Sequence, residues 1–451
     1  MNQLKFIIPS LLAVLLSLNV FLSCNRQTIT FAKDVAPIIH KNCTPCHQPS
    51  GAAPFSLIYY QQIKKKAKMI AHVTASKYMP PWPADISYSR FVNERYLTSA
   101  EIKILQLWYK QGAKSGDTST LKLPTNLFNQ ASLGKPDLII DVPSVDIKNN
   151  NLDQFYTIKI PYQNKERKYV RAIEFVPGKI KYVHHFNGHY LAFNETTNPF
   201  VGKRIANLSD SNYLNDFNEL KLQNADGSFP FRVHSAVNYL PGAFGIKYPE
   251  GIGGLVLEKN GAFIANDLHY GPSTKNITDN SKLFLYFSKT APQRPTYELM
   301  LGTNGVSKIE PPLIIPPNKI TTHRTSIMVY NDISILTINP HLHLLGKQFW
   351  AFAVKPNGDT IPLIKINKWE FRWQYFYTFK KAVKIPKGSS IIVIATFDNT
   401  SKNPNNPNKP PKVVAERFDK GGASMRTTDE MFQFIITYLP YQKGDENISL
   451  E

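Results

Sequence analysis

Five consecutive residues, Cys43-Thr44-Pro45-Cys46-His47, have the types and spacing that attach a haem covalently. In a C-x-x-C-H sequence the two thiols bond to the haem vinyl groups, and the next histidine binds the iron. The alternatives are a dithiol redox pair and half of a zinc site. The sequence has no second cysteine pair to complete a zinc site, and no thioredoxin-like pattern flanks the motif. We therefore expect one covalent haem c on Cys43 and Cys46, with His47 as an axial ligand.

A methionine downstream supplies a candidate for the other axial position. Met79 precedes two prolines, which keep the chain extended, and axial methionine is common in small cytochromes. Met69 is the competitor, but it falls in a lysine-rich helical stretch. We favour Met79, and we expect His40 and His72 to be packing or surface residues.

Three short segments later in the chain contain histidines with metal-binding spacing, namely Val183-His184-His185, His269-Tyr270-Gly271 and His341-Leu342-His343. The spacing of His341 and His343 points both rings to one face of a strand. Adjacent side chains of a regular strand face opposite ways, so the neighbouring pair can share an ion only at a bulge, a strand end or a twisted edge.

The cysteine content limits the chemistry of any second metal. The chain has three cysteines. If one carries a lipid and two carry haem, none is left for a disulfide or a thiolate-ligated copper centre. A further metal must then be bound by histidine, methionine or carboxylate.

The elements around the haem motif are expected to be helical. Residues 32–41 have helical apolar spacing, and Thr98 to Glu101 form a capping box that opens a second helix. That helix is expected to bury Ile102, Leu105, Leu107 and Trp108. The segment 31–116 resembles a small class I cytochrome c, which implies electron transfer, and residues 117–136 are typical of a linker.

From residue 137 onward, short alternating runs replace the helical pattern. Examples are residues 169–175, 283–287 and 391–397, which are bounded by glycine, proline and asparagine. This favours antiparallel β-sandwiches. The expected fold is multidomain, with a small all-α cytochrome c domain followed by two antiparallel, jelly-roll-like β-sandwich domains at 137–292 and 293–451.

The order of the histidine motifs, followed by Leu345-Gly346-Lys347 and then Asp429-Glu430-Met431, resembles the copper type II, ascorbate-dependent monooxygenases. Peptidylglycine alpha-hydroxylating monooxygenase and dopamine beta-monooxygenase belong to this family. The resemblance covers residues 137–440 and depends on the order of four motifs. It implies an enzyme that hydroxylates a C–H bond with dioxygen.

The resemblance also implies two mononuclear copper sites. Their expected ligands are His184, His185 and His269 for an electron-transfer copper, and His341, His343 and Met431 for an oxygen-activating copper. A thioether favours copper(I), the form that meets dioxygen. We expect the fused haem, itself reduced by an upstream redox donor, to deliver the electrons to these sites.

Three positions depart from the peptide-amidating member of the family. Asn339 stands where that enzyme has an arginine that grips a substrate carboxylate, and Gln433 and Ile435 replace an asparagine and a tyrosine. We expect an organic or peptide substrate other than peptidylglycine. His189, His234 and His323 match no family ligand and are expected to be structural.

Two other functions fit parts of the pattern. A non-catalytic electron-transfer or copper-carrying protein would use the same histidines but would need no substrate pocket. A zinc hydrolase is disfavoured because no motif supplies a carboxylate base and the ligand set includes a thioether.

The N-terminus predicts export and lipid anchoring. Lys5 precedes an apolar stretch from Phe6 to Leu22, and a small residue stands before Cys24, as in a lipoprotein processing site. Residues 1–23 would be the signal peptide, Cys24 the lipidated residue and 24–30 a tether. The alternative is an uncleaved anchor helix.

The chain is strongly basic, with a formal net charge of +20 over 451 residues. An anionic membrane surface would attract that charge, but a solvated basic surface is the favoured interpretation, and no nucleic-acid-binding signature is present in the sequence. The expected location is extracytoplasmic, bound to a bacterial membrane through the lipid.

Overall fold

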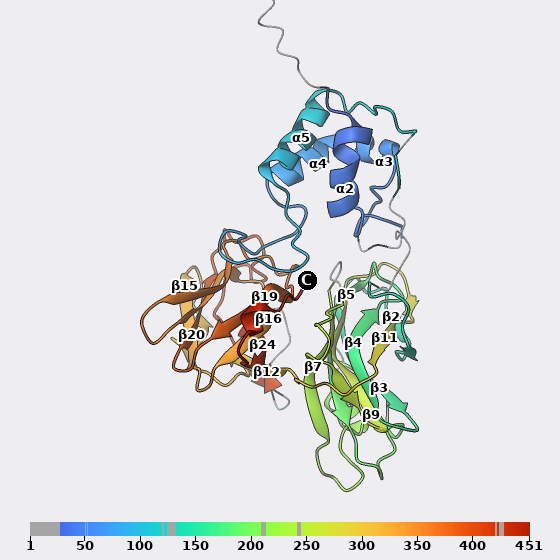
Figure 1. The fold of residues 1–451 in the computed structure, drawn as a ribbon, viewed down its shortest axis with the longest axis vertical. Coiled ribbons are helices and arrows are strands. Elements are labelled where there is room, and N and C mark those ends of the chain that lie inside the picture. Colours follow the sequence, from blue (N-terminus) through green and yellow to red (C-terminus); the bar gives the residue numbers. More distant parts are fainter. Residues whose placement is uncertain are drawn as a thin grey trace, which may run out of the picture. The chain divides into compact units, whose positions relative to one another are not determined.

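The computed structural model describes residues 28–49, 51, 53–119, 121–123, 132–208, 213–240, 245–419, 422–423 and 428–451 (Figure 1). The expected signal peptide and Cys24 lie outside these residues. The chain forms two compact units. The helical unit comprises Met1–Thr44, Leu57–Met79 and Leu97–Pro124, and the β unit comprises Pro45–Ser56, Pro80–Tyr96 and Thr125–Glu451.

The helical unit contains the helices expected around the haem motif. They are the π-helix η1 (Phe31–Val35) and the α-helices α2 (Ala36–Asn42), α3 (Tyr60–Lys65), α4 (Ala67–Ala75) and α5 (Ser99–Lys110). The capping box at α5 is present, because Thr98 and Glu101 bond each other's backbone N–H. Leu105 and Trp108 are buried, as expected, whereas Ile102 and Leu107 are only half-buried.

The first sandwich of the β unit packs two antiparallel sheets around an apolar core. One sheet has the order β1 (Leu138–Asp141), β11 (Lys282–Ser288), β4 (Lys168–Val176) and β8 (Leu255–Leu257). The other has the order β6 (Ile205–Asn207), β3 (Gln154–Gln163), β9 (Asn260–Tyr270), β5 (Val183–Ala192) and β7 (Phe231–Tyr239). A small pair, β2 (Val145–Ile147) with β10 (Ile277–Asp279), completes this sandwich.

The second sandwich also has two antiparallel sheets, which enclose a core of their own. The first runs β12 (Tyr297–Gly302), β24 (Phe432–Pro440), β16 (Ile333–Leu342) and β19 (Tyr377–Ile385). The second runs β13 (Ile309–Glu310), β15 (Ile320–Met328), β20 (Ser390–Asp398), β17 (Gly346–Val354) and β18 (Thr360–Ile366). Short pairs are β14 (Ile314–Ile315) with β21 (Val414–Ala415) and β22 (Phe418–Asp419) with β23 (Gly422–Ala423).

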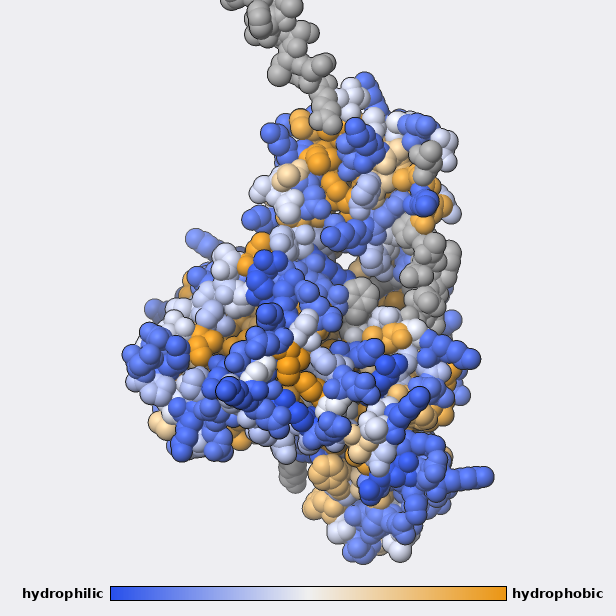
Figure 2. Space-filling view, in the orientation of Figure 1, coloured by the Kyte–Doolittle hydropathy of each residue, from blue (hydrophilic) through white to orange (hydrophobic). Residues whose placement is uncertain are grey.

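Strand β20 shows the alternation of buried and partly exposed residues that the sequence predicts. Ile391, Val393, Ala395 and Phe397 are buried, and the residues between them are partly exposed. A strand with one face on the core needs this period of two. The prediction of mostly antiparallel β structure is therefore confirmed, and hydrophilic residues predominate on the face drawn in Figure 2. One short helix, α6 (Tyr213–Glu219), was not anticipated.

Two polar contacts join the sandwiches of the β unit. The Tyr248 hydroxyl lies 2.7 Å from the Thr337 hydroxyl of β16. Arg294, between the sandwiches in sequence, donates to both carboxylate oxygens of Asp445 at 2.7 and 2.9 Å. Asp445 opens the short 3-10 helix η2 (Asp445–Asn447). The Tyr248 contact reaches β16, the strand that carries His341, and the Arg294 contact ties the connection between the sandwiches to η2.

The segment 80–96 packs on the second sandwich. Isolated bridges pair Ala84 with Ile366 of β18 and Phe91 with Phe379 of β19. Phe91 is 1% exposed, and its ring lies 5.0 Å from the rings of Tyr377 and Phe379. Residues that follow the expected haem ligand Met79 thus belong to the core of the second sandwich.

Among the described residues, no helix is long and apolar enough to cross a membrane.

Candidate metal centre

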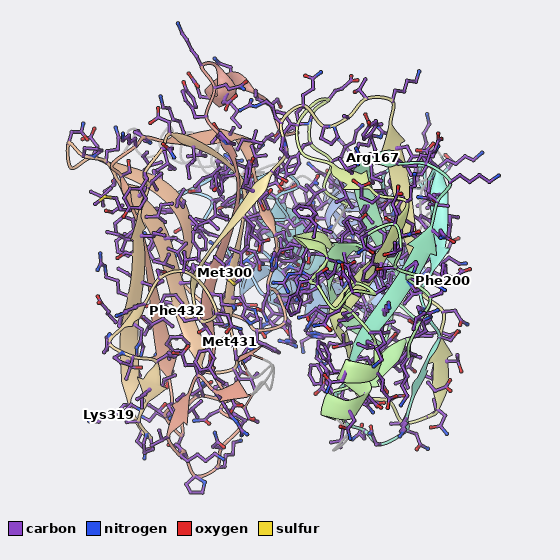
Figure 3. All side chains as sticks on the ribbon, turned by 90° about the horizontal axis from the view of Figure 1, so that it is seen from below. Arg167, Phe200, Met300, Lys319, Met431 and Phe432 are labelled. Carbon is purple, nitrogen blue, oxygen red and sulfur yellow. The ribbon has the colours of Figure 1, made fainter. Side chains whose placement is uncertain are left out.

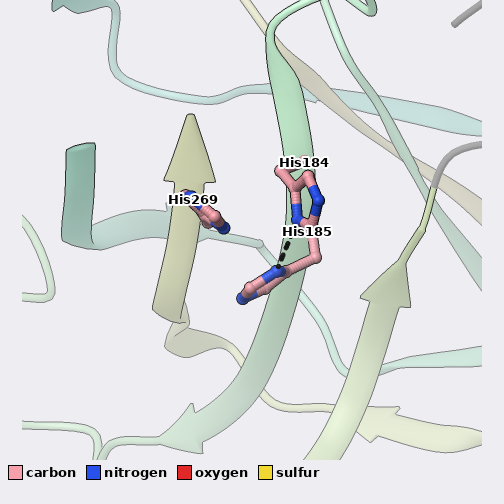
Figure 4. A group of neighbouring side chains, drawn as sticks. All are labelled: His184, His185 and His269. Atoms are coloured by element: carbon pink, nitrogen blue, oxygen red, sulfur yellow. Dashed lines mark hydrogen bonds between the residues drawn. The ribbon is translucent and has the colours of Figure 1, made fainter. Parts of the chain in front are cut away.

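Strands β5 and β9 bring His184, His185 and His269 together (Figure 4). Their candidate ligand atoms all lie within 4.8 Å of one another. The register pairs His185 with His269, and a register shift between Val183 and His185 places His184 in a bulge. The bulge turns two consecutive rings toward a common point, which a regular strand would not allow.

The spacing of the ring nitrogens fits a metal ion. The Nδ1 atoms of His184 and His185 are 3.4 Å apart. Metal–imidazole bonds of about 2.0–2.1 Å at tetrahedral angles place two ligand nitrogens about 3.3 Å apart. This donor set, three imidazoles, suits copper in either oxidation state.

The ring of His269 is fixed by neighbours on β3 and just before it. Its Nε2 donates to a carboxylate oxygen of Asp153 at 2.8 Å, and the ring of Phe155 stacks on it at 4.2 Å. The hydrogen bond to His269 lowers the pKa of the Asp153 carboxyl. Because Nε2 carries the proton, Nδ1 keeps its lone pair for a metal.

The second group lies at the end of β16. His341 is in the strand and His343 follows it, with their ring centroids 5.1 Å apart. His343 is 2% exposed, and its Nδ1 donates to the carbonyl oxygen of Asp429 at 2.9 Å. This hydrogen bond leaves Nε2 of His343 as the atom that can bind a metal.

Met431 lies beside this pair by register. Strand β24 pairs Gln433 with His341 and Phe432 with Leu342, so one further step places Met431 opposite His343. Met431 is 2% exposed, and Figure 3 labels it next to Phe432 on the second sandwich. The pairing thus places Met431 at the same strand end as His341 and His343.

Glu430 holds the two strand ends together. It is buried, and its carboxylate accepts backbone N–H groups from His343 at 3.0 Å, Leu345 at 2.7 Å and Met431 at 3.3 Å. Burial raises the pKa of Glu430 to about 8, although the three N–H groups oppose that shift. These bonds show that Glu430 shapes the strand end.

The expected haem residues are divided between the two units. Cys43 follows α2, and Met79 donates its backbone N–H to Val73 at 3.1 Å, both in the helical unit. Cys46 and His47 belong to the β unit. Cys43 and Cys46 are both half-buried and form no disulfide.

The surroundings of His47 fit an iron ligand. Its Nδ1 donates to the Phe55 carbonyl oxygen at 3.0 Å, which leaves Nε2 available. Burial lowers the pKa of His47, which favours the neutral ring. Neutral imidazole is the form that binds a metal.

The other histidines have structural surroundings. Both ring nitrogens of His323 are hydrogen-bonded, to the Pro311 carbonyl at 2.8 Å and the Thr321 hydroxyl at 2.9 Å. His189 and His234 pack edge to face at 5.1 Å, and Arg232 donates to His234 at 3.1 Å. A guanidinium at that nitrogen opposes binding of a cation.

His40 and His72 also agree with the packing or surface roles expected of them. Nε2 of His40 donates to the carbonyl oxygen of Ile58 at 2.9 Å. His72 is exposed on α4.

Comparison with known protein families gives one match. Residues 303–407 match the family model of the copper type II ascorbate-dependent monooxygenase, C-terminal domain. The matched range contains His341 and His343. The match supports a copper-dependent monooxygenase in general terms, and that family implies copper, dioxygen and a substrate.

Comparisons with whole proteins add nothing to this. No curated protein matches the chain. Among solved structures, the VP2 subviral particle of infectious bursal disease virus is 9% identical, with 70% of this chain and 74% of that chain covered and a TM-score of 0.17. The Gx strain of the same virus gives 8% identity, 69% and 74% coverage and a TM-score of 0.17. Likenesses with so low a TM-score carry no argument about fold or function.

Proposed function

We propose that the chain is a copper-dependent monooxygenase that places one oxygen atom of dioxygen into a C–H bond of an organic substrate. The observation that carries this proposal is the presence of two histidine groups on two sandwiches, one with metal-ligand spacing and one inside the family match. A protein that only carries copper at a single site would not require histidine groups on two sandwiches.

The proposed ligands differ in a way that suits two roles. Three imidazoles at His184, His185 and His269 support a copper that changes oxidation state with little rearrangement. The thioether of Met431, beside His341 and His343, favours copper(I). Copper ions held at these two sites would supply two electrons, which together with two protons from solvent would reduce the second oxygen atom of dioxygen to water.

The chain's own contribution is orientation. Asp153 and the carbonyl of Asp429 each accept a hydrogen bond from one ring N–H, and so they fix which nitrogen faces the metal. Glu430 ties His343, which follows β16, to Met431, which precedes β24, through their backbone N–H groups. An arrangement held in advance lowers the reorganisation needed during reaction.

Two positions that differ from the peptide-amidating enzyme are occupied by internal bonds. The Asn339 side chain donates to the Tyr375 carbonyl at 3.0 Å, and the Gln433 side chain donates to the Thr303 carbonyl at 2.7 Å. Neither side chain carries the positive charge that a substrate carboxylate needs. The proposed substrate is therefore not a peptide bound through a terminal carboxylate at these positions.

The proposal includes a covalent haem c on Cys43 and Cys46, with His47 and Met79 as axial ligands, as the route by which electrons enter. The C-x-x-C-H sequence and the His47 hydrogen bond support it. We also propose that Cys24 carries a lipid and that the protein is anchored outside the cytoplasm, on the strength of the N-terminal sequence pattern.

The decisive experiment measures metal and haem content in the purified mature protein. We expect one haem and two coppers in the wild type, one copper in His341→Ala, and two coppers in the surface control His72→Ala. Met431→Leu should weaken the second copper and abolish substrate-dependent oxygen consumption. Zinc in place of copper would overturn the proposal, and copper that a chelator removes readily without any oxygen turnover would favour a carrier.

A further inference from the structure

One aromatic ring contacts a histidine of each proposed copper site. The ring of Phe371 stacks on His184 with centroids 6.4 Å apart and planes at 19°. The same ring meets His343 edge to face, at 5.9 Å and 88°. Both separations are in the range of about 4.5–7 Å typical of aromatic contacts. Phe371 therefore lies between a residue of the first sandwich and a residue of the second.

The loop that carries Phe371 is tied to the strand that carries His341. Phe371 is half-buried in the connection between β18 and β19. Its carbonyl accepts the side-chain amide of Gln374 at 2.8 Å. Asn339, two residues before His341 on β16, donates to the Tyr375 carbonyl at 3.0 Å. These bonds give the ring a fixed position relative to the second site.

An aromatic stack continues from this loop and makes it rigid. Trp373 stacks on Tyr375 with centroids 6.3 Å apart and planes at 14°. Trp82, from the segment 80–96, also stacks on Tyr375, at 5.9 Å and 29°. Because packed rings already hold this loop in one conformation, the loop loses little further conformational entropy when its residues take part in a site.

We propose that Phe371 is a positioning residue that fills the space between the two histidine sites and carries the electron exchange between them. This inference rests on the proposed function. In the exchange, the copper at His184, His185 and His269 is oxidised by one electron and the copper at His341 and His343 is reduced by one. No bond forms or breaks, Phe371 is not itself oxidised, and an external one-electron donor of low potential restores the first copper.

The physical reason is the medium between the sites. Electron transfer is much faster through packed protein atoms than through water over the same distance. The reason is that the barrier to electron transfer is lower through the protein atoms. A ring in contact with both imidazoles replaces water along that span. Removing the ring admits water or leaves a void, and each lengthens the effective path.

The test follows electron exchange in the full-length protein loaded with copper(II). A light-driven donor delivers less than one electron per molecule, and rapid-freeze EPR spectra follow its distribution between the two copper signals. Phe371→Leu and Phe371→Met should slow the exchange relative to the wild type, because both remove the ring that contacts the two imidazoles. Phe371→Tyr, which keeps the ring, and the loop control Phe376→Leu should exchange at the wild-type rate.

A second measurement separates a conducting role from a structural one. Copper content and the copper–copper distance from pulsed EPR should be unchanged in Phe371→Leu. If that variant loses copper, Phe371→Met replaces it. Exchange at the wild-type rate without the ring, or equally slow exchange in Phe371→Tyr, would overturn the inference while the proposed function stands. A wild type that binds fewer than two coppers would reject both.

Discussion

Individual residues outside the two proposed ligand sets determine which ring nitrogen of a histidine can bind a metal. Asp153 and the Asp429 carbonyl each accept a hydrogen bond from a ring N–H, so the two rings present Nδ1 in His269 and Nε2 in His343. Partners of this kind orient a metal ligand and raise its basicity. The two sites are therefore specified by acceptors that the histidine motifs alone do not reveal.

Substitution Asp153→Asn should weaken copper binding at the three-histidine site only. An amide can donate to Nε2 of His269, which would shift the proton to Nδ1 and remove the lone pair that faces the site. We expect a loss of about 10- to 100-fold in copper affinity there. Competitive titration with a copper chelator measures it, with Asp141→Asn, an exposed residue of β1, as the control. Equal weakening at the second site would contradict the assignment.

Glu430 should contribute more to stability than an ordinary surface carboxylate. Glu430→Ala removes the acceptor of three backbone N–H groups at buried positions. Each unsatisfied group costs about 1–3 kcal/mol, so we expect the free energy of unfolding to fall by about 3 kcal/mol or more. Glu430→Gln keeps one acceptor oxygen and should lose less. Urea unfolding of the metal-free protein compares the two, and equal losses would exclude this explanation.

The sequence predicted some of these residues and could not predict others. The His184-His185 pair required a bulge in order to share an ion, and the structure has that bulge. Asp153 is 116 residues from His269, and no local pattern links the two. Phe371 could not be found either, because its role depends on a loop that meets both sandwiches. Local spacing predicts ligands, whereas their supports come from tertiary packing.

At the scale of elements, alternation of apolar residues was enough to predict the strands. It could not reveal that residues 80–96 pack against β18 and β19, because isolated bridges leave no periodic pattern. The same limit applies to α6, whose seven residues are too few for a clear helical period. Long periodic elements are predictable, and short connections acquire their structure from distant partners.

The element η2 should make stability depend on acid pH. Bonds from Arg294, Ser334 and the Gln442 N–H hold Asp445, which is 3% exposed, and lower its pKa to about 2. The unfolded carboxyl has a pKa of about 3.9. The charged form therefore contributes stability that is fully present above about pH 4 and is lost as the pH falls through about 2.

The size of this pH effect, and the control for it, follow from the contacts of Asp445. The difference in pKa corresponds to about 2.6 kcal/mol of unfolding free energy. Denaturant unfolding of the metal-free protein between pH 5 and pH 2 measures it, and Asp445→Asn should reduce the pH dependence by that amount. An unchanged slope in Asp445→Asn would assign the acid sensitivity to other carboxyls.

At the scale of the whole molecule, the second sandwich is assembled from segments far apart in the chain. Its core includes Ala84 and Phe91 together with strands that begin after residue 296. Phe91→Ala should destabilise the sandwich by about 3–5 kcal/mol, as buried Phe→Ala substitutions do. Faster hydrogen exchange at the amides of β19 would locate the effect, with Tyr59→Ala, an exposed aromatic, as the control. Unchanged exchange in β19 would contradict this role.

The placement of residues 80–96 also imposes an order on biosynthesis. The ribosome synthesises this segment before β18 and β19. Its aromatic side chains therefore stay exposed to solvent for about the time needed to add the intervening residues. Native contacts of such large sequence separation form slowly. A chaperone that shields the emerging chain would find its binding site here, and a chain truncated before β18 would keep this segment exposed to proteases.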